Sequence, residues 1–323
     1  MISRRAFTLL TAATALVPAL ARAQAYPTHP INFVVPFPAG NVTDVLARRI
    51  AHGLSTRLGQ TITVDNRAGA AGIIGTRFVA AAKPDGYTML YGSSGPIASH
   101  PSMYKDLPYA PLESFAPVNG LTSSPLVLVT AASQPYTSVH ELVEHLKNHP
   151  GEVTFGSPGN GTGAHLAAEL FQVNTGTRMT HVPYKDSAGL YSDLFAGRID
   201  VLFDFIAVMR PNLDAGKVRA LAVTREQRAS SLPSVPTLKE SGYDVVFNTW
   251  SSLLMPAGTP ADIVQKMSDA VRDTMASAEI VKYLEENDSI SNAELGPQEL
   301  RAFIVSEIEM YQHLVKKAGI SAN

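Results

Sequence analysis

Two stretches of the sequence combine glycines with hydroxyl and amide side chains directly after an apolar run. The first extends from Pro36 to Asp44, and the second from Gly156 to His165. Each precedes residues with a helical apolar repeat, so each is predicted to end a strand and begin a helix. The first N–H groups of a helix have no partner within it, and the helix dipole places about half a positive charge there. Such an end can hold an anion without Lys or Arg.

The candidate ligand-binding residues come mainly from these two stretches. In open α/β sheets ligands bind beyond the carboxyl ends of the strands, where both loops are expected to lie. Each helix end contributes only about 0.3–2 kcal/mol, whereas micromolar binding needs about 8 kcal/mol, so side chains must add direct hydrogen bonds. The predicted ligand-binding residues are Phe37, Pro38, Ala39, Gly40, Asn41, Thr43, Asp44, Ser93, Ser94, Ser157, Asn160, Gly161, Thr162, His165, Tyr184 and Asp204. The alternative for each loop is an ordinary turn and helix cap with nothing bound.

Other chemistries fit these residues less well. The glycine-rich loop lacks the lysine of a G-x-x-x-x-G-K-[ST] phosphate loop and shows no clean G-x-G-x-x-G. Gly92-Ser93-Ser94-Gly95 is not a G-x-S-x-G nucleophile elbow. Asp44 and Asp204 could each receive a ligand ammonium, or merely stabilise a helix start and a strand end. An enzyme acting on a small acid through His165 and Asp204 stays open as the alternative class.

A metal site and a cofactor are not predicted. His140 to His145 nearly spells the zinc-binding H-E-x-x-H motif. The second histidine, however, comes five residues after the first, which rotates it about 140° around a helix. We therefore interpret this segment as the solvated surface of a helix.

The composition of the 323-residue chain excludes several classes of protein. Lys and Arg number 26 against 28 Asp and Glu, which gives no basic surface for nucleic acid. The absence of Cys excludes thiolate nucleophiles, disulfides and cysteine-ligated metals. Hydrophobic residues make up 45% and charged residues 17%, so the chain can bury a large core, in two lobes or in one large α/β unit.

Residues 1–25 are predicted to be a signal peptide. A short basic start with paired arginines, typical of twin-arginine export, precedes an apolar run of about 12 residues, too short to span a bilayer comfortably. Small residues then offer cleavage after Ala23 or Ala25. We expect an exported, mildly acidic mature protein; the alternative is a retained membrane anchor.

Alternating strands and helices predict an α/β fold with two lobes, each a mostly parallel sheet flanked by helices. Strands are expected at 31–35, 62–64, 87–91, 126–130, 153–155, 181–184, 201–205 and 218–224. Prolines between Pro96 and Pro125 indicate irregular surface chain, and 260–275 and 297–316 are expected to be helices. The predicted lobe 1 comprises 26–125 plus 231–323 and lobe 2 comprises 126–230. Two crossover strands would join them around a cleft.

Six segments, in chain order, resemble the Bug family, the periplasmic solute receptors of tripartite tricarboxylate transporters. They are Tyr26 to Ile31, Val34 to Gly40, Pro84 to Thr88, Gly156 to His165, His181 to Lys185 and Ala196 to Asp200. The resemblance implies a Venus-flytrap fold of type II-like architecture and a monomeric receptor without enzymatic activity or cofactor. Its ligand would be a small organic carboxylate, held by Phe37 to Asp44 and Ser157 to His165 and delivered to membrane permease subunits. A sensor that presents its ligand to a membrane kinase is the other possibility.

Two positions depart from the family pattern. Asn41 stands where the first loop usually has a second glycine, and Asp186 stands where the P-Y-K-G segment ends in glycine. Asn41 is expected to narrow the pocket or contact the ligand, and Asp186 to place an extra acid near the cleft wall. Both departures bear on the choice of ligand and leave the predicted fold unchanged.

Overall fold

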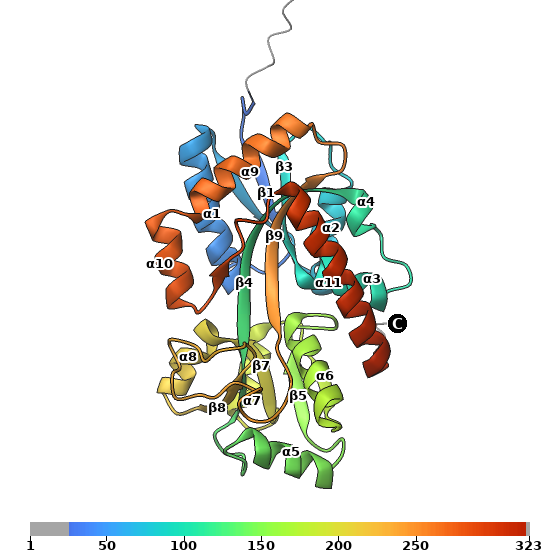
Figure 1. Ribbon diagram of the computed structural model, residues 1–323, viewed down its shortest axis with the longest axis vertical. Coiled ribbons are helices and arrows are strands. Elements are labelled where there is room, and N and C mark those ends of the chain that lie inside the picture. Colours follow the sequence, from blue (N-terminus) through green and yellow to red (C-terminus); the bar gives the residue numbers. More distant parts are fainter. Residues whose placement is uncertain (1–25, 321–323) are drawn as a thin grey trace, which may run out of the picture.

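The computed structural model describes residues 26–320, so the predicted signal peptide lies outside the described residues. These residues form one ten-stranded sheet, in which eight strands follow the order β2-β1-β3-β9-β4-β7-β5-β6 and the other two, β8 and β10, pair with β4. Helices cover this sheet in two lobes, one above the other in Figure 1. The two-lobed α/β class predicted from the sequence is confirmed.

The strand β4 (Phe115–Ala131) belongs to both lobes and connects them. From Phe115 to Pro125 it pairs antiparallel with β9, and from Leu126 onward it pairs with β7 and β8. We call the part containing β1, β2, β3, β9 and β10 sheet A, the base of lobe 1. The part containing β5, β6, β7 and β8 is sheet B, the base of lobe 2. Both β4 and β9 run vertically between the lobes in Figure 1.

Parallel strand–helix units build both lobes around this shared strand. Lobe 1 contains β1 (Ile31–Val35), α1 (Val42–Leu58), β2 (Ile62–Asn66), the short helix η1 (Ala70–Gly72), α2 (Ile73–Ala80), β3 (Thr88–Ser93), the π-helix η2 (Gly95–Ser99), α3 (His100–Met103), α4 (Pro111–Ser114), β9 (Asn248–Pro256), α9 (Ala261–Met275), α10 (Ala278–Glu286), β10 (Ile290–Ser291) and α11 (Pro297–Ala318). Lobe 2 contains α5 (Val139–Asn148), β5 (Thr154–Ser157), α6 (Gly163–Thr175), β6 (Thr180–Pro183), α7 (Ser187–Phe195), β7 (Val201–Phe205), α8 (Ile206–Asp214) and β8 (Val218–Val223).

The prediction of irregular surface chain between Pro96 and Pro125 holds for residues 104–110, which lie outside helices and strands, and is wrong on both sides of them. Pro96 lies in η2, whose five residues are all buried. Pro117 and Pro125 lie within β4, which begins at Phe115 instead of Leu126. Proline cannot donate to a strand ladder, and β4 accommodates both residues at irregular points. The register with β9 shifts just after Pro117, and Pro125 is the last residue paired with β9 before β4 turns to sheet B.

The lobe boundaries remain a proposal, and the hydrogen bonds support a modified version of it. The first crossing coincides with the change of partners at Pro125 and Leu126. After β8, however, the chain stays with sheet B. The Val223 N–H of β8 donates to the Pro236 carbonyl, and the Leu238 N–H donates to the Val223 carbonyl. The Phe247 N–H donates to the Thr224 carbonyl. We therefore propose that lobe 2 extends to Phe247 and that the second crossing is the start of β9.

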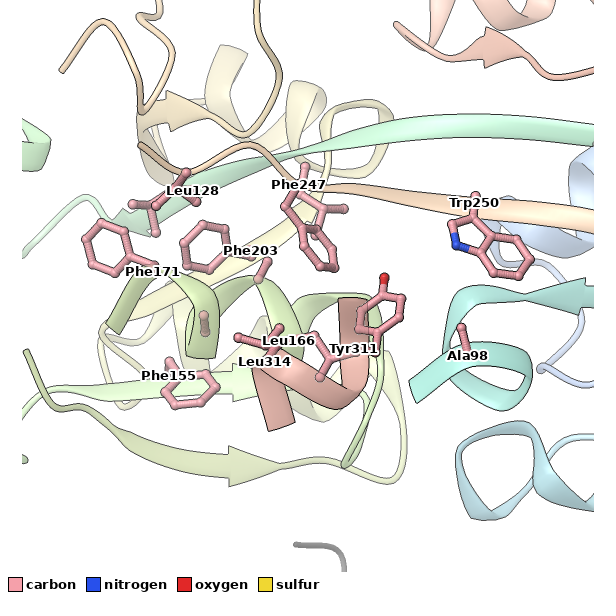
Figure 2. Packing of buried hydrophobic residues seen from close by; sticks show 14 of the residues in the cluster. Ala98, Leu128, Phe155, Leu166, Phe171, Phe203, Phe247, Trp250, Tyr311 and Leu314 are labelled. Atoms are coloured by element: carbon pink, nitrogen blue, oxygen red, sulfur yellow. The ribbon is translucent and has the colours of Figure 1, made fainter. Parts of the chain in front are cut away.

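The two faces of the sheets have different cores. One core lies on the α1, α9 and α10 side of sheet A, and another on the α7 and α8 side of sheet B. On the opposite side a single cluster passes from one lobe to the other through α11. Figure 2 shows Tyr311 and Leu314 of α11 beside Leu166 of lobe 2, with Trp250 and Ala98 of lobe 1 farther along. The C-terminal helix therefore packs against both lobes.

Candidate functional site

The first predicted ligand loop follows β1 and is held in shape by Asp44. The Oδ2 atom of Asp44 accepts the Gly40 N–H at 2.8 Å and pairs with Nε of Arg48 at 2.9 Å. Its Oδ1 accepts from the side-chain amide of Asn66 at 2.9 Å, and the same amide donates to the Phe37 carbonyl. Every oxygen of this carboxylate is therefore engaged by its own lobe.

Asp44 consequently acts on the shape of the loop. Burial raises the pKa of its carboxyl, but the hydrogen bonds from Arg48, Gly40 and Asn66 outweigh that effect, and the pKa lies below its ordinary value. The side chain is 3% exposed, so it is ionised and surrounded by protein donors. The structure favours the helix-start role for Asp44 over reception of a ligand ammonium.

The tip of the first loop is exposed and lies directly before α1. Pro38, Ala39 and Gly40 are exposed, and Phe37 is half-buried. Asn41 caps α1, because its Oδ1 accepts the Asp44 N–H at 2.8 Å. The amide expected to narrow the pocket thus has a defined structural partner.

The second loop follows β5 and is folded around Ser157. This side chain is 0% exposed, and its Oγ lies 2.6 Å from Nε2 of His181 and accepts the Gly159 N–H at 3.1 Å. The Thr162 hydroxyl donates to the Gly159 carbonyl at 2.8 Å. The hydroxyl groups of Ser157 and Thr162 therefore form hydrogen bonds within the loop that was predicted to bind the ligand.

His165 supports the same loop from below. Its Nδ1 accepts the Gly161 N–H at 3.0 Å, so the proton of the neutral ring is on Nε2, which lies 3.5 Å from Glu169. The ring is 3% exposed and stacks on His181 with centroids 4.1 Å apart. His165 thus positions the loop, and His181, which sequence reasoning did not select, is part of that support.

The second loop contacts lobe 1 at η2. Oγ of Ser99 donates to the Gly161 carbonyl at 3.0 Å, and both groups are buried. Gly161 has φ of +76°, and a Cβ there would come within 2.9 Å of the His100 ring. Only glycine fits this close approach between the lobes. Ser99 and His100 were not selected from the sequence, because the surrounding prolines suggested surface chain.

Three helices of lobe 2, α6, α7 and α8, begin at the carboxyl edge of sheet B. They differ in whether a carboxylate lies close to the helix start. Asp186 caps α7, accepting the Gly189 N–H at 2.8 Å, and Asp204 directly precedes the start of α8. The helix α6 has no acidic residue in its first turn and no side-chain cap, since the Thr162 hydroxyl is turned to Gly159. Asp186 therefore offsets the dipole of its own helix, and α6 keeps an uncompensated positive end.

The N–H groups at the start of α6 are correspondingly free. Among residues 26–320, no hydrogen bond takes the main-chain N–H of Gly163, Ala164 or His165. The side chains of Asn160 and Thr43 are half-buried, and no hydrogen bond engages them within the same range. The main-chain N–H groups of Val42 and Thr43 at the start of α1 likewise have no hydrogen-bond acceptor among the described residues. Both loops therefore present donors that the chain itself leaves without an acceptor.

Asp204 lies on a different face of sheet B from His165. Its carboxyl accepts from the Tyr191 hydroxyl at 2.8 Å and from the Phe205 N–H, and burial raises its pKa to about 6. Tyr191 packs on the α7 and α8 side, whereas His165 stacks with Phe155 of the core that α11 covers. The sheet thus separates the two residues that the enzyme alternative requires to act together.

The remaining candidates point in different directions. The Tyr184 hydroxyl donates to Asp193 at 2.6 Å, and burial raises its pKa to about 12. Ser94 is buried beside the hydroxyl of Tyr311 in α11. Oγ of Ser93 is buried and has no hydrogen-bond partner among the described residues, so it remains a donor at the end of β3.

Neither of two surface hollows, each of about 450 Å³, is lined by the loops. One lies between the start of α5 and β8, and the other between α1 and β2. Within residues 26–320 no cluster of three metal-ligating side chains occurs. Among the same residues, no helix has the length and apolar character needed to cross a membrane.

The shared strand, the parallel lobes and the paired loops define a periplasmic-binding-protein fold. The sequence model described as the tripartite tricarboxylate transporter family receptor matches residues 46–320, so the chain belongs to this family. Protein BugT of Bordetella pertussis is 36% identical over 309 residues, which cover 95% of this chain and 94% of BugT. The resemblance inferred from the six sequence segments is confirmed.

Solved structures of relatives agree in fold along nearly the whole chain. A protein of R. palustris with adipate is 35% identical, has a TM-score of 0.86, and matches over 92% of this chain and 99% of its own. MatC from Rhodopseudomonas palustris with bound malate is 28% identical, with a TM-score of 0.83 over 90% and 100% of the two chains. The chain is therefore similar to two proteins whose structures contain a dicarboxylate, adipate in one and malate in the other.

The role of Asp44 in shaping the first loop predicts a large loss of stability on truncation. Asp44→Ala leaves the Gly40 N–H and the Asn66 amide without their acceptor, which should lower the free energy of unfolding by about 2–3 kcal/mol. Urea denaturation measures this difference. Asp273→Ala, at an exposed position of α9, is the matched control and should cost less than about 0.5 kcal/mol. Equal losses in the two variants would contradict the assigned role.

The two buried histidines, His181 and His100, predict that the free energy of unfolding decreases as the pH falls. Burial, and secondarily the nearby His165, lowers the pKa of His181 to about 3, and burial lowers that of His100 to about 4. Both rings are neutral in the folded chain at pH 5, whereas the unfolded chain protonates them below its ordinary value of 6.5. The unfolded state then binds more protons, so folding stability is lost as the pH falls from 6.5 toward 4.

The variant His181→Phe tests this linkage while keeping an aromatic ring against Phe155. The difference in unfolding free energy between about pH 7 and pH 4.5 should shrink by about 1–2 kcal/mol, because one titrating group is gone. The exposed residue His52 supplies the control His52→Gln, which should keep the wild-type pH dependence. Parallel curves for wild type and His181→Phe would exclude the histidine as the cause.

Proposed function

We propose that this protein is an exported receptor that captures a small organic carboxylate between its two lobes for a tripartite tricarboxylate-type transporter. The first loop, Phe37 to Asp44, and the second loop, Ser157 to His165, would hold the ligand from opposite sides. The mature protein would act in the periplasm as a monomer and hand its ligand to membrane permease subunits. It would bind without catalysing a reaction.

The uncompensated start of α6 is the observation that carries this proposal. The first turns or caps of α1, α7 and α8 have a carboxylate close by, from Asp44, Asp186 and Asp204 respectively. The start of α6 has none, and the N–H groups of Gly163, Ala164 and His165 are free within the described residues. A carboxylate placed there receives short hydrogen bonds and a favourable dipole.

The chemistry of the surrounding donors favours a carboxylate with a further polar group. Asn160 and Thr43 supply an amide and a hydroxyl beside the two helix starts, and Ser93 supplies a buried hydroxyl at the end of β3. These neutral donors suit the oxygens of a second carboxylate. The adipate and malate held by related structures are acids of this kind, and they support a dicarboxylate as the ligand class here.

The geometry of the acidic and basic side chains supports a receptor over an enzyme. Ser157 lies within hydrogen-bond distance of a histidine, His181, as a catalytic serine would. The serine is completely buried, however, and its hydroxyl also bonds to Gly159. His165 is oriented by Gly161, and Asp204 is bound by Tyr191 on the other face of sheet B. A reaction needs these groups around one substrate atom, whereas binding needs only the donors at the helix starts.

The variant Thr162→Asp tests the proposed anion site. An aspartate at this N-cap position would take the free N–H groups of α6 and repel a ligand carboxylate, so adipate affinity should fall at least about tenfold. Folding stability should stay equal or rise, because the helix gains a cap. Calorimetry with adipate and malate measures the affinity, and thermal unfolding measures the stability.

Ser277→Asp is a matched control. Ser277 is the N-cap of α10 and also makes no side-chain cap bond, but α10 lies on the outer side of lobe 1. This variant should stabilise its helix and leave ligand affinity unchanged. Wild-type affinity in Thr162→Asp would remove the α6 start from the site. Product formation from either acid by the wild-type protein would favour the enzyme alternative.

A further inference from the structure

A buried carboxylate on lobe 1 receives hydrogen bonds from two consecutive serines of the segment that returns from lobe 2. Asp288, in the turn between α10 and β10, has a side chain that is 0% exposed. Its Oδ1 accepts the N–H and the hydroxyl of Ser230 at 2.8 and 2.9 Å, and the Ser231 N–H at 3.4 Å. Its Oδ2 accepts the Ser231 hydroxyl. We call these three residues the Asp288 latch.

The serine side of the latch is attached to lobe 2. The residues flanking the serines, Ala229 and Leu232, are 1% and 9% exposed and belong to the core under α7 and α8. The Ser231 carbonyl accepts from Arg210 of α8. The serines must therefore move with lobe 2.

The carboxylate side of the latch is attached to lobe 1. Asp288 has φ of +52°, a conformation that aspartate tolerates better than most residues. Its N–H donates to Glu285 at 3.2 Å, and the Ser289 N–H donates to Leu284 at 2.9 Å. Leu284 is 4% exposed in the core of lobe 1, so Asp288 moves with α10.

The latch lies beside the crossing strands, on the side away from α11. β10 follows Asp288 and pairs with β4 at Thr122 and Ser123, close to the change from sheet A to sheet B. In Figure 1, α10 and α11 lie on opposite sides of β4 and β9. The contact of Ser99 with Gly161 belongs to the η2 side, against which α11 packs. Hydrogen bonds therefore connect the two lobes on both sides of β4 and β9.

The charge of Asp288 makes the latch sensitive to lobe position. The nearest cationic atom, Nη1 of Arg225, is 3.8 Å away, so the serine donors carry most of the stabilisation of the buried charge. Hydrogen bonds to charged groups are stronger than neutral ones and weaken with small displacements. A rotation of lobe 2 that separates the serines from Asp288 would leave a buried charge without its donors.

We propose that Asp288 is a positioning residue that holds the lobes in the relative arrangement of this structure and, if the protein is the proposed receptor, thereby sets ligand affinity from a distance. It contacts neither of the two loops. A receptor that is closed for only part of the time binds its ligand more weakly by that fraction. Loosening the latch should therefore weaken binding and widen the range of interlobe positions, although no group near the ligand changes.

The interlobe distance tests this proposal without any ligand. Because the chain has no cysteine, Lys83→Cys in lobe 1 and Lys147→Cys in lobe 2, both exposed, provide two unique spin-label sites. Pulsed electron spin resonance should give one narrow distance distribution for the otherwise wild-type protein. The variant Asp288→Asn, and separately Ser230→Ala combined with Ser231→Ala, should broaden it or add a longer distance. Ser306→Ala, which removes only a bond within α11, is the control and should not.

Adipate titration then separates a positioning role from a general loss of structure. The latch variants should bind about three- to tenfold more weakly, and saturating adipate should restore the narrow distribution. Unchanged distributions in both latch variants would overturn the proposal, as would a broadened distribution that saturating ligand fails to narrow. The ligand-free measurement stands even if adipate does not bind to the wild-type protein, which would count against the proposed function alone.

Discussion

The main-chain N–H groups at the start of a helix must find acceptors, and this constraint governs the region between the lobes. At α1 and α7 a side chain accepts one of these groups: Asn41 accepts the Asp44 N–H, and Asp186 accepts the Gly189 N–H. At α6 the available hydroxyl, that of Thr162, bonds to Gly159 instead. The loop that holds this arrangement needs its own support, from Ser157, His181 and His165. The buried polar residues of lobe 2 are thus arranged so that one helix end stays free.

The position of that helix end depends on how the lobes are joined. β4 is a single strand whose partners change at Leu126, and Thr224 completes the crossing by bonding to the Leu126 and Phe247 main chains. On one side of the crossing strands, α11 packs against both lobes. On the other side, Asp288 of lobe 1 accepts a hydrogen bond from the Ser230 N–H of lobe 2. Because both sides are fixed, Gly161 can approach Ser99 closely enough to bond. Small changes at these connections would move the free end of α6 relative to the first loop.

Much of the fold could be predicted because its signals are local. The strand expected at 31–35 is found at Ile31–Val35, and the helix expected at 260–275 is found at Ala261–Met275. The proline-rich segment misled the prediction, because the prolines of β4 are accommodated by its pairing with β9, which lies far away in the sequence. Pro96 lies at the start of η2, where the missing N–H of proline does no harm. The side chains of the site were equally hard to assign. The types of Asp44 and His165 indicate polar chemistry, but only the folded partners Gly40, Asn66 and Gly161 show that these residues shape the loops.

The two departures from the family pattern have a common physical consequence. An amide at 41 and a carboxylate at 186 both cap the helix that follows, so at each of these helix starts a side chain of the protein accepts one main-chain N–H. In lobe 2 the carboxylate also offsets the positive end of α7, which lies at the same edge of sheet B as α6. A ligand carboxylate would then find one clear positive end there instead of two. We infer that Asp186 narrows the choice of where an anion can lie, without forming part of its binding surface.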